Sequence, residues 1–134
     1  MNPQRFHGKV ALITGASSGI GRTTAVAFAR EGATVVLADL DEENGHSAVR
    51  SIEELGAKAL FLRADVTSAA DAQSLVRGIV DAFGRLDFAY NNAAIAVADS
   101  SEMRETADFE EETWDRIIDV NLKGVWLCMK YELR

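Results

Sequence analysis

The hydrophobic positions of the chain gather into four short apolar runs. They span residues 10–13, 34–39, 59–64 and 86–90, and each is followed by glycine or polar residues. Runs of this length, rich in valine, leucine and isoleucine, are typical of strands buried on both faces of a sheet. The pattern therefore predicts four buried strands.

Segments with helical periodicity separate these runs. The clearest one places its apolar residues on a single stripe: Ala72, Leu75, Val76, Ile79, Val80 and Phe83. Such spacing of three and four residues is typical of an amphipathic helix. Two further helices are predicted, one from Ile20 to Glu31 and one from the N-cap Asp41 to about Leu55. A glycine follows each of the three, as is common at helix C-termini.

A fourth helix is predicted near the C-terminal end of the sequence. Asp108, followed by Glu111 three residues later, matches a capping box, so Asp108 is the predicted N-cap. Apolar residues fall on or near one face of this helix: Trp114, Ile117, Ile118, Leu122, Val125, Trp126 and Met129. We expect this face to lie in the core or in a subunit interface. The polar stretch 95–107 that precedes the helix predicts only a loop.

Alternation of buried strands with helices favours parallel strands joined by right-handed crossovers. We therefore predict an α/β fold with a Rossmann-type doubly wound parallel sheet, of which the chain supplies four strands and four helices. The length of 134 residues fits a single domain spanning residues 1–134.

Charge and composition limit the kinds of partner and site that the chain can have. The net charge of −7 argues against nucleic acid or an anionic membrane as a partner. No apolar stretch approaches the ~20 residues of a membrane span. Cys128 is the only cysteine, which fits a buried apolar position in a cytoplasmic protein. His7 and His46 are isolated, so no metal site is predicted.

The chemistry of the chain concentrates in the glycine-rich turn after the first strand. Gly15, Gly19 and Gly21 stand between a predicted strand and a predicted helix. Glycines let a backbone turn sharply and approach a phosphate, and the N–H groups of the following helix favour an anion. Arg22 and Thr23 follow the last glycine one place too late for a mononucleotide P-loop. The loop therefore predicts a dinucleotide pyrophosphate site.

Asp39 ends the second predicted strand, where a carboxylate can accept hydrogen bonds from an adenosine ribose. The same charge would repel the 2′-phosphate of NADP, and residues 16–18 contain no basic side chain to offset it. NAD is therefore the predicted cofactor, with NADP disfavoured. Asp41 is the competing candidate, although its position favours a helix-capping role.

Four motifs in this order resemble the short-chain dehydrogenase/reductase family. Residues 14–21 match its TGxxxGxG loop, and residues 65–67 resemble its adenine-contacting segment. Residues 91–94 are similar to its NNAG motif, with Ala94 in place of the glycine, and residues 120–124 resemble the segment that holds its catalytic asparagine. The resemblance covers essentially the whole chain and implies hydride transfer between a nicotinamide cofactor and an alcohol or carbonyl substrate.

The loop, Asp39 and the resemblance together predict the site residues. The cofactor-binding residues are Gly15, Ser17, Ser18, Gly19, Ile20, Gly21, Asp39, Leu40, Asp65, Val66, Asn92, Ala93 and Ala94. The resemblance assigns Asn121 to a proton relay, whereas its place on an apolar stripe by itself favours a structural hydrogen bond. Asn91 is interpreted as tying the end of the fourth strand to its neighbours, with a place in the lining of the cofactor site as the alternative. The resemblance also implies a homo-oligomer formed through the last helix.

The acid that hydride transfer requires is absent from the 134 residues. In the resembling family it is a tyrosine with a lysine four residues later, together with a serine. Neither Tyr90 nor Tyr131 has such a lysine. We therefore expect this chain alone to be inactive, as the N-terminal half of a dehydrogenase fold, a shortened sequence or a natural short form. The alternative function is a non-catalytic nucleotide-binding or interaction module.

Overall fold

The computed structural model of the chain describes residues 4–97 and 104–134. In chain order the strands and helices are β1 (Val10–Thr14), α1 (Gly19–Arg30), β2 (Thr34–Asp39), α2 (Glu42–Glu53), β3 (Ala59–Arg63), α3 (Ala69–Phe83), β4 (Phe88–Tyr90), a 3-10 turn (Thr106–Asp108), α4 (Glu111–Ile118), a π-helical turn (Asp119–Lys123) and α5 (Gly124–Glu132). The predicted strands and first three helices are present, with ends shifted by up to about two residues.

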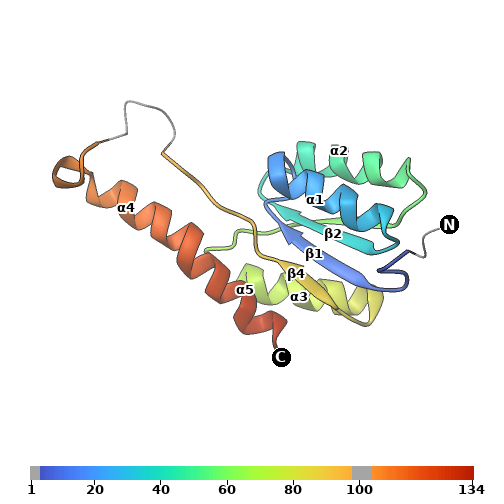
Figure 1. The fold of residues 1–134 in the computed structure, drawn as a ribbon. Helices are drawn as coiled ribbons and strands as arrows, with labels where there is room; N and C mark the ends of the chain where they lie inside the picture. Colours follow the sequence, from blue (N-terminus) through green and yellow to red (C-terminus); the bar gives the residue numbers. More distant parts are fainter. Residues whose placement is uncertain (1–3, 98–103) are drawn as a thin grey trace.

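The strands form one parallel sheet in the order β3-β2-β1-β4. Helices α1 and α2 cover one face of the sheet, and α3 covers the other (Figure 1). The prediction of a doubly wound parallel α/β fold is confirmed. The strand order reverses at β1, so the chain segments that follow β1 and β4 lead to opposite faces of the sheet, and a crevice forms between them at the carboxyl ends of the strands.

The core explains why the strand sequences are apolar without alternation. Ile13 and Leu37 pack with α1 and α2 in one cluster, whereas Leu12 and Val36 pack with α3 in the other. Both faces of β1 and β2 are buried, as parallel sheets require. At the sheet edge β4 is exposed, because β1 is its single partner among the strands of the described residues.

The N-terminus of the last helix differs from its prediction. Asp108 is not its N-cap: a 3-10 turn closes on Asp108, Phe109 and Glu110 are extended, and α4 begins at Glu111 without a side-chain cap. The extended residues remove Asp108 from the first turn, so no capping box forms. Of the two places predicted for the apolar face, the core of the chain is excluded for Trp114 and Trp126, which are 57% and 53% exposed, and the subunit interface stays a prediction. Cys128 is buried, as predicted.

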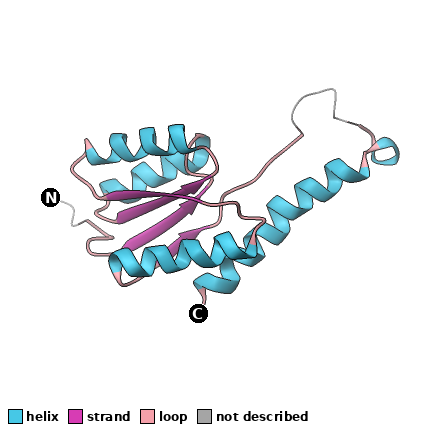
Figure 2. Ribbon diagram, turned by 180° about the vertical axis from the view of Figure 1, so that it is seen from behind, coloured by secondary structure: helices cyan, strands magenta, loops and turns pink. Residues whose placement is uncertain are grey.

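Helix α4, the π-helical turn and α5 follow one another without a break and form one continuous helix, as Figure 2 shows. In the π-helical turn the Gly124 N–H donates a hydrogen bond to the Asp119 carbonyl, five residues earlier. A π-helical turn leaves the regular hydrogen-bond ladder and is frequent at functional sites. Asn121 lies at its centre.

Candidate functional site

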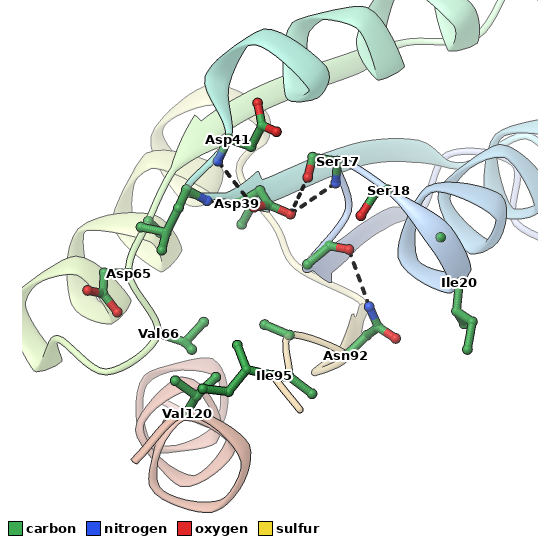
Figure 3. Close-up of a pocket in the computed structure, with 17 residues that line it drawn as sticks. Ser17, Ser18, Ile20, Asp39, Asp41, Asp65, Val66, Asn92, Ile95 and Val120 are labelled. Atoms are coloured by element: carbon green, nitrogen blue, oxygen red, sulfur yellow. Dashed lines mark hydrogen bonds between the residues drawn. The ribbon is translucent and has the colours of Figure 1, made fainter. Parts of the chain in front are cut away.

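A cavity of about 730 Å³ opens at the carboxyl ends of the four strands. Its walls come from the loop between β1 and α1, the end of β2, and the segments that follow β3 and β4 (Figure 3). The lining residues are Gly15, Ser17, Ser18, Gly19, Ile20, Ala38, Asp39, Leu40, Asp41, Ala64, Asp65, Val66, Asn92, Ala93, Ala94, Ile95 and Val120. All predicted cofactor residues except Gly21 line it.

The glycines of the loop allow close backbone approach. Gly15 has a φ of +64°, and a Cβ on it would lie 2.9 Å from Ala93 Cα. A Cβ on Gly21 would collide with the Gly15 carbonyl group. Gly21 therefore acts by letting α1 pack onto the loop, as the third glycine of such a turn does, and it does not itself face the cavity.

The first turn of α1 keeps its backbone donors free of side-chain partners. Ser18 is the N-cap, its side chain makes no capping hydrogen bond, and the first turn holds no acidic residue. Ile20, in that turn, is 71% exposed and lies beside the cavity in Figure 3. Unsatisfied N–H groups and the positive end of the helix dipole favour an anion here.

Asp39 lies in the cavity wall next to the loop that leads into this helix N-terminus. Its Oδ2 accepts hydrogen bonds from the Ser17 N–H at 3.1 Å and the Ser17 hydroxyl at 2.7 Å (Figure 3). Its Oδ1 accepts from the N–H groups of Leu40 and Asp41. These contacts fix the carboxylate in the cavity wall, and they tie the end of β2 to the glycine-rich loop.

Asp41, the competing candidate, caps a helix. Its carboxylate accepts bonds from the backbone and side-chain amides of Asn44, and these bonds lower the pKa of Asp41. The sequence interpretation of Asp41 as a cap is confirmed, although the residue also contributes to the cavity wall.

Asp65 and Val66 form the wall after β3. Asp65 Oδ1 accepts from the N–H and hydroxyl of Thr67, and its Oδ2 has no protein donor among the described residues. Helix α5 supports this wall closely, because a Cβ on Gly124 would lie 2.8 Å from Val66 Cγ2. Asp65 thus has one carboxylate oxygen available for a polar group of a ligand.

Thr14 connects the ends of β1 and β4, a role that the sequence interpretation missed. Its hydroxyl oxygen accepts from the N–H groups of Asn92 and Ala93, both at 3.0 Å. The Asn92 side chain donates in turn to the carbonyl groups of Thr14 and Gly15. A polar residue at the end of an otherwise apolar strand is the signal that could have identified it.

Asn121 lies beside the cavity and not in its wall, whereas its neighbour Val120 does line it. The Asn121 amide bonds the backbone of Ile95 twice, accepting from its N–H at 2.8 Å and donating to its carbonyl at 2.7 Å. The side chain therefore clamps the segment after β4 to the last helix. Such pairing is what a partly buried asparagine requires.

The described residues offer neither a cluster for a metal ion nor a membrane-spanning helix. No group of three or more histidine, cysteine, aspartate or glutamate side chains is placed to hold a metal ion in residues 4–97 and 104–134. None of the helices in this part of the chain is long and apolar enough to cross a membrane.

The fold and the loop define a Rossmann-type domain, and comparison with known proteins gives its family. Residues 9–134 match the short chain dehydrogenase family, so the chain belongs to that family of oxidoreductases. This finding confirms the resemblance drawn from the four sequence motifs.

Three similar proteins illustrate the match. The chain is 44% identical to the short chain dehydrogenase/reductase astE of Aspergillus oryzae, covering 99% of this chain and 51% of that protein. It is 41% identical to a cyclohexanol dehydrogenase of an Acinetobacter species, with 96% and 50% covered. The crystal structure of an NAD+-bound xylitol dehydrogenase superposes with a TM-score of 0.89 at 33% identity, with 95% and 47% covered. The chain thus spans about half the length of these proteins.

Proposed function

We propose that residues 1–134 form an NAD-binding domain of an oxidoreductase that interconverts an alcohol and a carbonyl compound. One observation supports this most strongly: the open first turn of α1 and the carboxylate of Asp39 face the same cavity. A positive helix end and an acceptor for ribose hydroxyls are the two features that recognise a dinucleotide.

The lining residues divide between the parts of the cofactor. In this proposal the turn 15–21 surrounds the pyrophosphate, with Gly15, Ser17, Ser18, Gly19 and Ile20 in contact and Gly21 behind them. Asp39 and Leu40 hold the adenosine ribose, and Asp65 and Val66 hold the adenine. Asn92, Ala93 and Ala94 border the ribose on the nicotinamide side. When bound, the cofactor supplies or accepts the hydride.

The preference for NAD over NADP follows from charge. The Asp39 carboxylate is fixed by Ser17 and cannot turn away from a 2′-phosphate without losing those bonds. The neighbouring loop residues Ala16, Ser17 and Ser18 provide no positive charge to compensate. The NAD+-bound xylitol dehydrogenase among the similar structures supports the same cofactor.

Asn121 is proposed to serve the proton relay of the catalytic reaction as a positioning residue. Its amide holds Ile95, which follows the proposed nicotinamide-side wall. Within the 134 residues there is no tyrosine followed four residues later by lysine. The alternative proposal is a nucleotide-binding or interaction module without turnover.

The exposed face of the last helix supports a further proposal, a homo-oligomer formed through this helix. Trp114, Leu122 and Trp126 are each more than half exposed on this helix. Large apolar side chains grouped in this way are typical of an interface between subunits. Sedimentation of the purified chain at several concentrations would measure the association.

The test is a fluorescence titration of the purified chain with NADH, followed by an absorbance assay with NAD and a series of secondary alcohols. We expect saturable binding that ADP-ribose competes away. Saturable binding would support the nucleotide-binding domain that both proposals share, and NADH formation would favour the oxidoreductase over the binding module. Absence of NADH binding would overturn both.

A further inference from the structure

A buried contact outside the cavity joins the end of β4 to the last residue of α5. The Asn91 side-chain N–H donates to Glu132 Oε2 over 2.9 Å. The other two oxygens of the pair, Asn91 Oδ1 and Glu132 Oε1, are also buried, and no donor from the described residues reaches either. Both unpartnered atoms therefore belong to planar groups that already share one hydrogen bond.

Two buried acceptors without donors are unfavourable, since each has lost water and gained nothing in return. One proton would remove both defects, because a protonated carboxyl group donates whereas a carboxylate only accepts. We propose that Glu132 is a neutral acid in the folded chain and that its O–H donates to Asn91 Oδ1. The acid and the amide then form a doubly hydrogen-bonded pair between β4 and α5.

The surroundings of Glu132 agree with a neutral acid. Burial raises its pKa, and the hydrogen bond from Asn91 opposes this to a smaller extent. Burial is also the larger cause that raises the pKa of the nearby Cys128 thiol to about 11. The other ionisable groups on these elements are Tyr90 on β4, Asp71, Arg77 and Asp81 on α3, which packs with α5, and Lys130, Tyr131 and Arg134, which are near Glu132 in sequence. None of these is a cause of the shift at Glu132.

The pair lies next to the proposed cofactor site. Asn91 is followed directly by Asn92, whose side chain holds the carbonyl groups of Thr14 and Gly15. Fixing Asn91 to α5 therefore orients the wall segment 92–94. In this respect Glu132 is a positioning residue, and that role rests on the proposed function, whereas its protonation does not.

Urea unfolding as a function of pH tests the pair, with wild type, Glu132→Gln and Glu132→Ala. Glutamine supplies the donor and acceptor of the neutral acid but does not titrate. The raised pKa stabilises the fold below the unfolded value of 4.5, and this stabilisation is lost as the pH rises through the folded value. The unfolding constant of wild type should therefore rise relative to Glu132→Gln over that window, by up to about tenfold per pH unit. Glu132→Ala should be the least stable at low pH.

The exposed α2 residue Glu53 provides the matched control, because Glu53→Gln makes the same chemical change without a buried partner. Its unfolding curve should not diverge from wild type in this way. Parallel curves for wild type and Glu132→Gln would overturn the proposal, as would a wild type that gains stability relative to Glu132→Gln with rising pH. NADH affinity should follow the same pH profile in wild type alone. A chain that does not bind NADH would refute the proposed function while the unfolding data still decide the pair.

Discussion

Three helices begin at the same edge of the sheet, and their N-termini are satisfied differently. Asp41 caps α2 by accepting from Asn44, and Ser68 caps α3 by accepting from Asp71. Helix α1 has a serine at the same position, but Ser18 makes no capping bond. The protein thus satisfies the first turns of α2 and α3 itself and leaves that of α1 open toward the cavity.

The residues around the three N-termini explain the difference. Acidic side chains occupy the first turns of α2 and α3, where they complement the helix dipole. The first turn of α1 contains glycine and isoleucine, and no carboxylate competes with an incoming anion. A helix end that is open, positive and close to a glycine-rich turn is suited to a phosphate ligand.

Gly21→Ala should have the largest effect, because it pushes α1 away from the carbonyl of Gly15. We expect a loss of about 1–3 kcal/mol of unfolding free energy and a loss of NADH affinity of at least about tenfold. Urea unfolding and NADH titration measure the two. The control is Gly78→Ala in α3, where the nearest atom is the flexible end of Leu62 at 3.2 Å. If Gly21→Ala bound NADH like wild type, the close approach of α1 to the loop would be irrelevant to binding.

Asp39→Ala should have the second-largest effect, which we expect on cofactor affinity. Removing a carboxylate that bonds ribose hydroxyls costs about 1.5–3 kcal/mol, or roughly a 10- to 100-fold loss in NAD affinity. NADP affinity should rise or stay unchanged, since the repulsion disappears. Calorimetric titration with both cofactors checks this. Asp41→Asn is the matched control, because asparagine keeps the cap of α2 while removing a neighbouring charge. Tighter binding of NADP than NAD by wild type would contradict the assignment.

A pair of serine substitutions addresses the helix ends directly. Ser68→Ala should lower the unfolding free energy by about 1 kcal/mol, because it removes the cap of α3. Ser18→Ala should change it little, since the Ser18 side chain caps nothing. Urea unfolding of the two variants in the absence of cofactor measures the contrast. Equal losses would mean that α1 is capped after all.

The smallest effect on stability is expected from Asp87→Asn, at the edge of the sheet where the strands begin. There Asp87 receives the side chain of Arg85 and the N–H of Val10, and these bonds lower the pKa of Asp87 to about 2. A lowered pKa stabilises the fold above the unfolded value of 3.8, and this is lost as the pH falls through about 2. Asp87→Asn should therefore be less stable than wild type near pH 7 and approach it in strong acid. A pH-independent difference in acid unfolding would count against this.

The sequence predicted most of the fold because its signals are local. Apolar runs and glycine stops located β1 to β3 and α1 to α3, and the glycine-rich loop with Asp39 located the cavity. The failures depend on tertiary structure. Asp108 matched a capping box, but the extended Phe109 and Glu110 separate it from α4. The exposure of Trp114 could not be inferred from helical periodicity, which does not say what covers a face.

The site shows the same division. Residues next to the glycine-rich loop were identified from their motifs, whereas Val120 lines the cavity only because the last helix runs back past it, where Asn121 holds Ile95. The role of Thr14 depends on β4 pairing beside β1, which places Asn92 and Ala93 within hydrogen-bond distance. Such contacts join residues far apart in sequence, and no local pattern encodes them.

The most direct test of the open helix end is an NMR titration of the isotopically labelled chain with NAD. We predict that the backbone amides of Gly19, Ile20 and Gly21 show the largest shifts, while those in the first turns of α2 and α3 change little. ADP-ribose should reproduce the pattern, and nicotinamide alone should not. Shifts confined to other parts of the chain, or none at saturating NAD, would contradict the assignment of α1 as the pyrophosphate site.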